Sequence, residues 1–111
     1  YSQNQKQEID SLNQILKNKK IDDSTIVNLY NNISALYYQS DPDTTLYICS
    51  ENIRRIDSFL ANSKKIYTTE ERNKILLAKT VAQNHIAVIQ LYKGNSSLAL
   101  KCFLSNLKMQ L

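Results

Sequence analysis

The side chains that could support acid–base or metal chemistry are few and scattered. His85 is the single histidine, and no cysteine or carboxylate accompanies it at the spacing of metal ligands or of a nucleophile and its base. The acidic pairs 22–23 and 70–71 stand where helices are expected to begin, where negative charge suits the helix dipole. Loops that cradle phosphate use several glycines, and the chain has only Gly94. We therefore expect no enzymatic activity, no metal and no cofactor, with His85 packed or at the edge of a groove.

Cys49 and Cys102 each fall on the apolar face of an expected helix, where cysteine behaves as a small hydrophobic residue. A disulfide between them requires Cα atoms within about 7 Å of each other. That separation depends on helix packing, so the sequence leaves both the bridge and the cellular compartment open.

The composition indicates long helices with few joints. Glycine and proline, which turns and sheets use heavily, occur once each in 111 residues, and 42% of the residues are hydrophobic. This predicts a single all-α domain over 1–111. No run of about eighteen apolar residues is present, so we expect no insertion into a membrane. The chain begins at Tyr1, not at methionine, which suggests a fragment of a longer protein.

The net charge of +4 is unevenly distributed. No acidic residue follows Glu71, and the basic residues beyond it are Arg72, Lys74, Lys79, Lys93, Lys101 and Lys108. Such a segment attracts nucleic acid or an acidic partner, but the charges are spread along helices and no DNA-reading motif accompanies them. We therefore do not favour nucleic-acid binding. The basic run at 17–20 is interpreted as favourable charge at a helix end, with an anion or membrane contact as the alternative.

Apolar residues recur at helical spacing in five segments. We expect an N-terminal helix at 3–17, a helix hairpin at about 23–61 and a second hairpin at about 69–109. The residues expected to face the core are Ile9, Leu12, Ile15, Leu16, Ile26, Leu29, Ile33, Leu36, Tyr37, Leu46, Cys49, Ile53, Ile56, Leu60, Ile75, Leu76, Ala78, Ala82, Ile86, Ile89, Leu91, Leu98, Ala99, Cys102, Phe103 and Leu107.

Capping residues set the predicted helix boundaries, because a side-chain oxygen can accept from the free N–H groups of a first helical turn. The expected starts are Asp22 to Ser24, Ser40 or Asp41 before Pro42, Thr68 with Glu71 as a capping box, and Asn95 or Ser96. Gly94 is expected to end the preceding helix in the left-handed conformation.

The stretch 84–107 resembles a tetratricopeptide repeat. The residues that carry the resemblance are the large-small pair Ile86-Ala87, the turn Gly94-Asn95, the small residue Ala99 and the aromatic Phe103. Two positions depart from the family pattern: Gln83 stands where the family usually has a large residue near the start, and Asn106 stands where it has its last alanine. An earlier stretch, 31–53, matches through the pair Ile33-Ser34, at a spacing of about 53 residues where the standard unit has about 34.

Residues 24–108 also resemble the repeat-containing sensor regions of bacterial histidine kinases and transcriptional regulators. The resemblance implies antiparallel hairpins stacked into an α-α superhelix, protein or peptide recognition in signal transduction, and a periplasmic location, with the cytoplasm as the alternative. Carried over to this chain, the family's ligand groove is lined by Asn31, Ala35, Tyr38, Asn84, Val88, Leu91 and Tyr92. An asparagine amide there can donate to and accept from an extended peptide, or it can simply be a solvated helix position.

We therefore expect a non-catalytic module that binds a protein or peptide, as the sensor or scaffold portion of a signalling protein. One alternative is self-assembly through a C-terminal apolar stripe of Leu104, Leu107, Met109 and Leu111. A second alternative is that the chain is part of a nucleic-acid-associated transcriptional regulator. Tyr37 and Tyr38, with Tyr30 and Tyr47, form either an aromatic recognition surface or the edge of the core.

Overall fold

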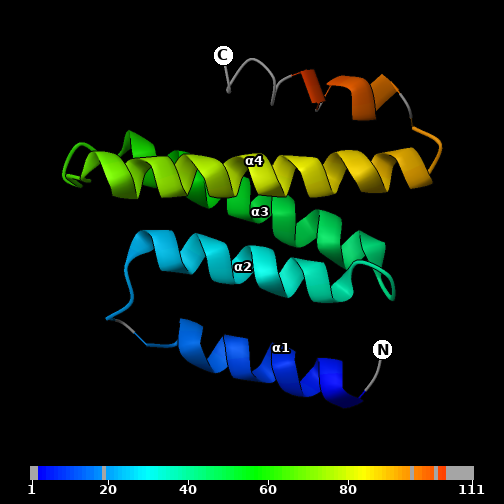
Figure 1. Cartoon of the computed structure of the whole chain (residues 1–111), viewed down its shortest axis with the longest axis horizontal. Helices are drawn as coiled ribbons and strands as arrows, with labels where there is room; N and C mark the ends of the chain where they lie inside the picture. Colours follow the sequence, from blue (N-terminus) through cyan, green and yellow to red (C-terminus); the bar gives the residue numbers. More distant parts are fainter. Residues whose placement is uncertain (1–2, 19, 96, 102, 105–111) are drawn as a thin grey trace.

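A computed structural model describes residues 3–18, 20–95, 97–101 and 103–104. Its helices are α1 (Gln3–Leu16), α2 (Asp23–Tyr37), α3 (Pro42–Ala61) and α4 (Thr69–Tyr92), and further helical residues lie at 97–101 and 103–104 (Figure 1). No residue in these ranges belongs to a β-strand, so the predicted all-α class is confirmed. None of the helices in the described ranges is long and apolar enough to cross a membrane.

Successive helices are antiparallel, and α1 to α4 follow one another from the bottom to the top of Figure 1. Helices α2, α3 and α4 each contact the other two, while α1 contacts α2. The Cα atoms extend over 41 × 38 × 17 Å, so the molecule is flat. The α1–α2 and α3–α4 loops therefore lie at one end, and the α2–α3 turn and the end of α4 lie at the other (Figure 1).

The helices begin at the predicted capping residues. Asp22, Asp41 and Thr68 are the N-caps of α2, α3 and α4, and Pro42 occupies the first turn of α3. Each cap side chain accepts from a backbone N–H three residues on, with donor–acceptor distances of 3.0 Å (Thr25), 3.2 Å (Thr44) and 3.1 Å (Glu71). Hydrogen bonds from Thr25 and Thr44 lower the pKa of Asp22 and of Asp41, because they favour the carboxylate.

Helix α4 ends as predicted at Gly94, whose φ of 79° lies in the left-handed region. The N–H of Asn95 donates to the carbonyl of Gln90 at 2.8 Å, and the N–H of Gly94 donates to the carbonyl of Leu91 at 3.0 Å. This pair of bonds is the Schellman motif, which satisfies carbonyls at a helix end. The next helical segment starts where the N–H of Ala99 donates to the carbonyl of Asn95.

The core changes character along the helices. At the end that holds the α3–α4 loop it is apolar, with Val27, Ile56, Ile75 and Ala78 in one buried cluster. Phe59, Leu60 and Tyr67 pack against this cluster. One buried Ile or Val side chain contributes about 1.5–3 kcal/mol to stability, so this layer is the main hydrophobic anchor of the three-helix centre.

The next layer of the core is made of side-chain amides. Asn52 is fully buried, and its Nδ2 donates to the carbonyl of Val27 at 2.9 Å and to Oδ1 of Asn31 at 3.0 Å. Asn31 is only 5% exposed, and its Nδ2 donates to the carbonyl of Ala78 at 2.9 Å. Arg55 donates to Oδ1 of Asn52 at 3.1 Å. These bonds link α2, α3 and α4 through groups that need a partner once they are buried.

The predicted core face of α2 is incomplete. Leu29 and Ile33 are buried as expected, but Ser24, Val27, Asn31 and Ser34 are buried as well. Because residues two positions apart on a helix point in nearly opposite directions, α2 buries two faces. One face is joined to α3 and α4 by the amides, and the other lies on the side of α1 (Figure 1).

Several predicted core positions are wrong. Ile15, Leu91, Leu98 and Phe103 are 45%, 48%, 51% and 38% exposed. Of the described residues in the helical segment after Gly94, only Ala99 is buried. The segment lies along α4, and no other described helix lies on its far side (Figure 1). Ser96, Cys102 and residues 105–111, which include Leu107, Met109 and Leu111, lie outside the described residues.

Candidate binding groove

Two adjoining cavities of about 380 Å³ each lie at the end of the molecule that carries the α2–α3 turn. Both are lined by Tyr38 and Gln39, so together they form one surface, which we call the Tyr38 groove. The other lining residues are Gln5, Ala35, Leu36, His85 and Val88 in the first cavity, and Pro42, Ile89, Tyr92 and Lys93 in the second.

The turn at the centre of the groove is fixed by hydrogen bonds. Tyr38 follows the last residue of α2, and its N–H donates to the carbonyl of Ala35 at 3.3 Å. The N–H of Asp41 donates to the carbonyl of Tyr37 at 2.8 Å, and Asp41 then caps α3. The backbone therefore holds Tyr38 between α2 and the C-terminal half of α4.

Aromatic and charged pairs connect α4 with the rest of the groove. The rings of Tyr38 and Tyr92 meet edge to face, with centroids 6.1 Å apart and an interplanar angle of 69°. Such a pair contributes about 0.5–1.5 kcal/mol beyond burial. Desolvation raises the pKa of the Tyr38 phenol, which therefore stays a neutral donor. Lys93 at the end of α4 forms an ion pair with Asp43 at the start of α3.

His85 lines the groove and also reaches into the core. Its Nδ1 lies 3.4 Å from Oγ of Ser34 and 4.0 Å from Sγ of Cys49. Oγ of Ser34 donates to the carbonyl of Asn31 at 2.8 Å, and Oγ1 of Thr45 donates to the carbonyl of Ser34 at 2.7 Å. The imidazole thus extends the polar core layer to the groove.

Cys49 is a free, fully buried cysteine. Burial raises the pKa of its thiol, whereas a nucleophilic cysteine needs a lowered pKa and an open approach. The contact with His85 is therefore made by a protonated thiol. Among the residues that the structure describes, no three His, Cys, Asp or Glu side chains are placed to hold a metal ion.

The burial of His85 predicts a specific pH dependence of stability. Desolvation lowers the pKa of its imidazole from the ordinary value of 6.5, so protonation is harder in the folded chain than in the unfolded one. The free energy of unfolding should be highest above about pH 6.5 and fall as the pH drops from there to the lower pKa of the folded state. The pKa values of Asp22 and Asp41 are lowered from 3.8, so these two carboxyl groups change the free energy of unfolding only at a more acidic pH than His85 does.

Urea denaturation at about pH 7.5 and about pH 5.5 measures this effect. His85→Gln, which retains polar atoms near Ser34, should lose most of the pH dependence within that window. An unchanged difference between the two pH values in the variant would assign the effect to another group.

The structure brings together four of the predicted groove residues, Ala35, Tyr38, Val88 and Tyr92. Asn84 and Leu91 are exposed on α4 but do not line the two cavities. The placement of Asn31 on this surface is wrong, because its amide is buried and bonded to Ala78 and Asn52.

Gln5, Gln39 and Pro42 also line the groove and were not predicted. Gln5 comes from α1, which no repeat pattern relates to the two hairpins, and its Nε2 lies 3.5 Å from the carbonyl of Leu36. Pro42 could have been predicted from the sequence, because it marks the turn between the two helices of the first hairpin, and this turn forms the centre of the groove. Tyr30 and Tyr47 lie apart from the groove, where they line a smaller cavity of about 160 Å³ with Arg55 over the Tyr30 ring.

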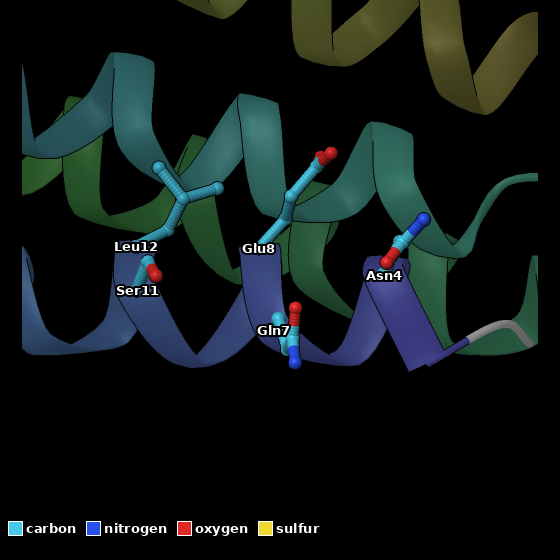
Figure 2. A pocket seen from close by; sticks show the side chains of 5 residues that line it. All are labelled: Asn4, Gln7, Glu8, Ser11 and Leu12. Carbon is cyan, nitrogen blue, oxygen red and sulfur yellow. The ribbon is translucent and has the colours of Figure 1, made fainter.

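A further cavity of about 430 Å³ is lined by Asn4, Gln7, Glu8, Ser11 and Leu12. All five residues belong to α1, and Figure 2 shows Glu8 and Leu12 directed toward α2. Because one helix supplies every lining side chain, this hollow brings no separate elements together. The Tyr38 groove, built by α1, α2, the turn and α4, is the stronger candidate.

Comparison with protein families, with curated proteins and with solved structures finds no match to this chain.

Proposed function

We propose that the chain is a non-catalytic module that binds a protein or peptide segment, and that the Tyr38 groove is its binding surface. The observation that carries the proposal is the adjoining pair of cavities that share Tyr38 and Gln39. Apolar and aromatic walls with a few polar groups are typical of sites that hold a ligand by burial and orient it by hydrogen bonds.

The groove offers two kinds of contact to an extended peptide. Tyr38, Tyr92 and Val88 supply apolar area that can receive side chains. Gln39, which is exposed, supplies an amide that can both donate to and accept from a peptide main chain. No carboxylate is among the residues that line either cavity, and the charge of Lys93 is compensated by Asp43, so a neutral segment fits best.

The proposal includes the tetratricopeptide-like class and a place in a bacterial signalling sensor or scaffold. Its support is the residue pattern together with burial at the positions where that pattern needs small side chains. Ala87 and Ala99 are fully buried, as is Ser34 of the earlier hairpin. In this class the first helices of successive hairpins line the ligand surface, and α2 and α4 both line the Tyr38 groove. A periplasmic location follows only from the resemblance.

Val88→Lys should weaken peptide binding by about tenfold or more, because a charged chain would fill the first cavity and displace an apolar contact. Peptides are first enriched from a displayed library of random sequences on the natural chain, and their affinities are then measured by fluorescence anisotropy. The matched control is Leu77→Lys, the same change on α4 at a residue that is 65% exposed and outside both cavities.

Circular dichroism spectra should coincide for the natural chain and both variants. Failure to enrich any peptide, or equal affinity in the two lysine variants, would contradict the assignment of the groove.

A further inference from the structure

The two loops at the end opposite the groove are built alike. In the first, the N–H of Lys20 donates to Oδ1 of Asn18 at 3.0 Å, and in the second the N–H of Lys64 donates to Oδ1 of Asn62 at 3.0 Å. Each asparagine follows the end of a helix, α1 or α3, and each turn presents an exposed lysine two residues later. Figure 1 shows both loops at the same end of the stack.

The second loop is held against the start of α2. Oδ2 of Asp23 accepts from Nζ of Lys65 at 2.6 Å and from the Tyr67 hydroxyl at 2.5 Å. Tyr67 also packs against the apolar core cluster. The loop residues 62–68 are thus anchored on both sides of Ile66, and the start of α2 lies between the two lysine-bearing turns (Figure 1).

Ile66 itself is 94% exposed, the highest value among the large hydrophobic side chains of the described residues. Single exposed hydrophobic residues are ordinary, but Ile66 lies between the anchored Tyr67 and the lysines at 64 and 65. Because Lys65 and Tyr67 are both bound to Asp23, the backbone projects Ile66 into solvent.

In the part of the chain that the structure describes, three lysines at the end of the molecule that carries Ile66 have no ion-pair partner. Lys17, Lys20 and Lys64 are exposed, and none of them has a carboxylate within ion-pairing distance among the described residues. Of the acidic side chains at this end, Asp23 pairs with Lys65 and Glu70 pairs with Lys74. Asp22 and Glu71 accept from uncharged groups of Thr25 and Thr68 and keep their negative charge, so these three lysines outnumber the two unpaired carboxylates.

We propose that this end of the molecule docks peripherally on an anionic membrane surface. Ile66 enters the boundary between headgroups and acyl chains, and Lys20 and Lys64 meet the negative headgroups beside it. An apolar side chain that inserts, next to basic side chains that pair with anionic lipid, is the combination that holds a protein at a bilayer surface. The phosphates of a nucleic acid would pair with the lysines only, and Ile66 would then have no apolar partner. The proposal is independent of the Tyr38 groove.

The chain contains no tryptophan, so Ile66→Trp introduces a single fluorescent reporter at the proposed contact. On vesicles of phosphatidylcholine with phosphatidylserine, its emission should shift to shorter wavelength, and on phosphatidylcholine alone it should not. Leu77→Trp, on the exposed face of α4, should show no shift with either vesicle. A shift at both positions or at neither would overturn the proposed orientation.

Charge reversal tests the lysines in vesicle sedimentation. Lys20→Glu with Lys64→Glu should lower partitioning onto phosphatidylserine vesicles by about tenfold or more, and added salt should lower it for the natural chain. The control, Lys6→Glu with Lys101→Glu, changes the net charge equally at exposed residues away from this end and should retain most of the binding. Equal loss in both pairs would mean that net charge alone attracts the protein. Binding to duplex DNA through Lys20 and Lys64, without binding to vesicles, would overturn the proposal in favour of a nucleic-acid contact.

Discussion

Replacing Asn52 with alanine is expected to lower the free energy of unfolding by about 2–4 kcal/mol. The Asn52 amide is fully buried and makes three bonds, donating to the carbonyl of Val27 and to Asn31 and accepting from Arg55. Alanine would leave the Val27 carbonyl and Oδ1 of Asn31 without these donors inside the protein. The loss is large because stability totals only about 5–15 kcal/mol for a typical domain.

Urea denaturation followed by circular dichroism measures this effect. The control is Asn32→Ala, an exposed asparagine next to Asn31, which should change stability by less than about 0.5 kcal/mol. Asn31→Ala combined with Asn52→Ala should cost less than the sum of the two single changes, because the variants remove one shared bond. Additive losses would contradict the network, as would an equal loss in Asn32→Ala.

The helix starts could be predicted because caps are local. Asp22, Asp41 and Thr68 act on N–H groups three residues away, so a short stretch of sequence contains both donor and acceptor. The end of α4 at Gly94 is predictable for the same reason. These boundaries, with apolar spacing between them, were enough for the all-α class.

The amide layer could not be predicted because its members are polar and distant in sequence. The Asn31 side chain donates to the carbonyl of Ala78 on α4 and accepts from Asn52 on α3. A search for hydrophobic periodicity counts only apolar residues, so it does not place an asparagine in the core. Asn31 was expected on a surface because the resemblance to the repeat family places it in the ligand groove. Ala35, Tyr38, Val88 and Tyr92, which the resemblance also names, line the two cavities because they lie on α2 and α4 or directly after α2, whereas the position of Gln5 depends on how α1 packs against α2.

Ile56→Ala should have the other large effect on stability, a loss of about 2–5 kcal/mol. Ile56 is fully buried with Val27, Ile75 and Ala78 at the point where α2, α3 and α4 meet. Alanine removes buried methyl and methylene groups and leaves a cavity that neighbours on three helices cannot easily close. Thermal and urea unfolding of the variant measure the loss.

The same substitution at Ile66 is the matched comparison. Because Ile66 is 94% exposed, Ile66→Ala should leave the free energy of unfolding within about 0.5 kcal/mol of the natural chain. Near-equal losses at Ile56 and Ile66 would show that Ile66 is covered by protein in solution, which would remove the basis for its contact with a membrane. A loss confined to Ile56 separates the two roles: one isoleucine holds three helices together, and the other contributes nothing to folding and is free to act at a surface.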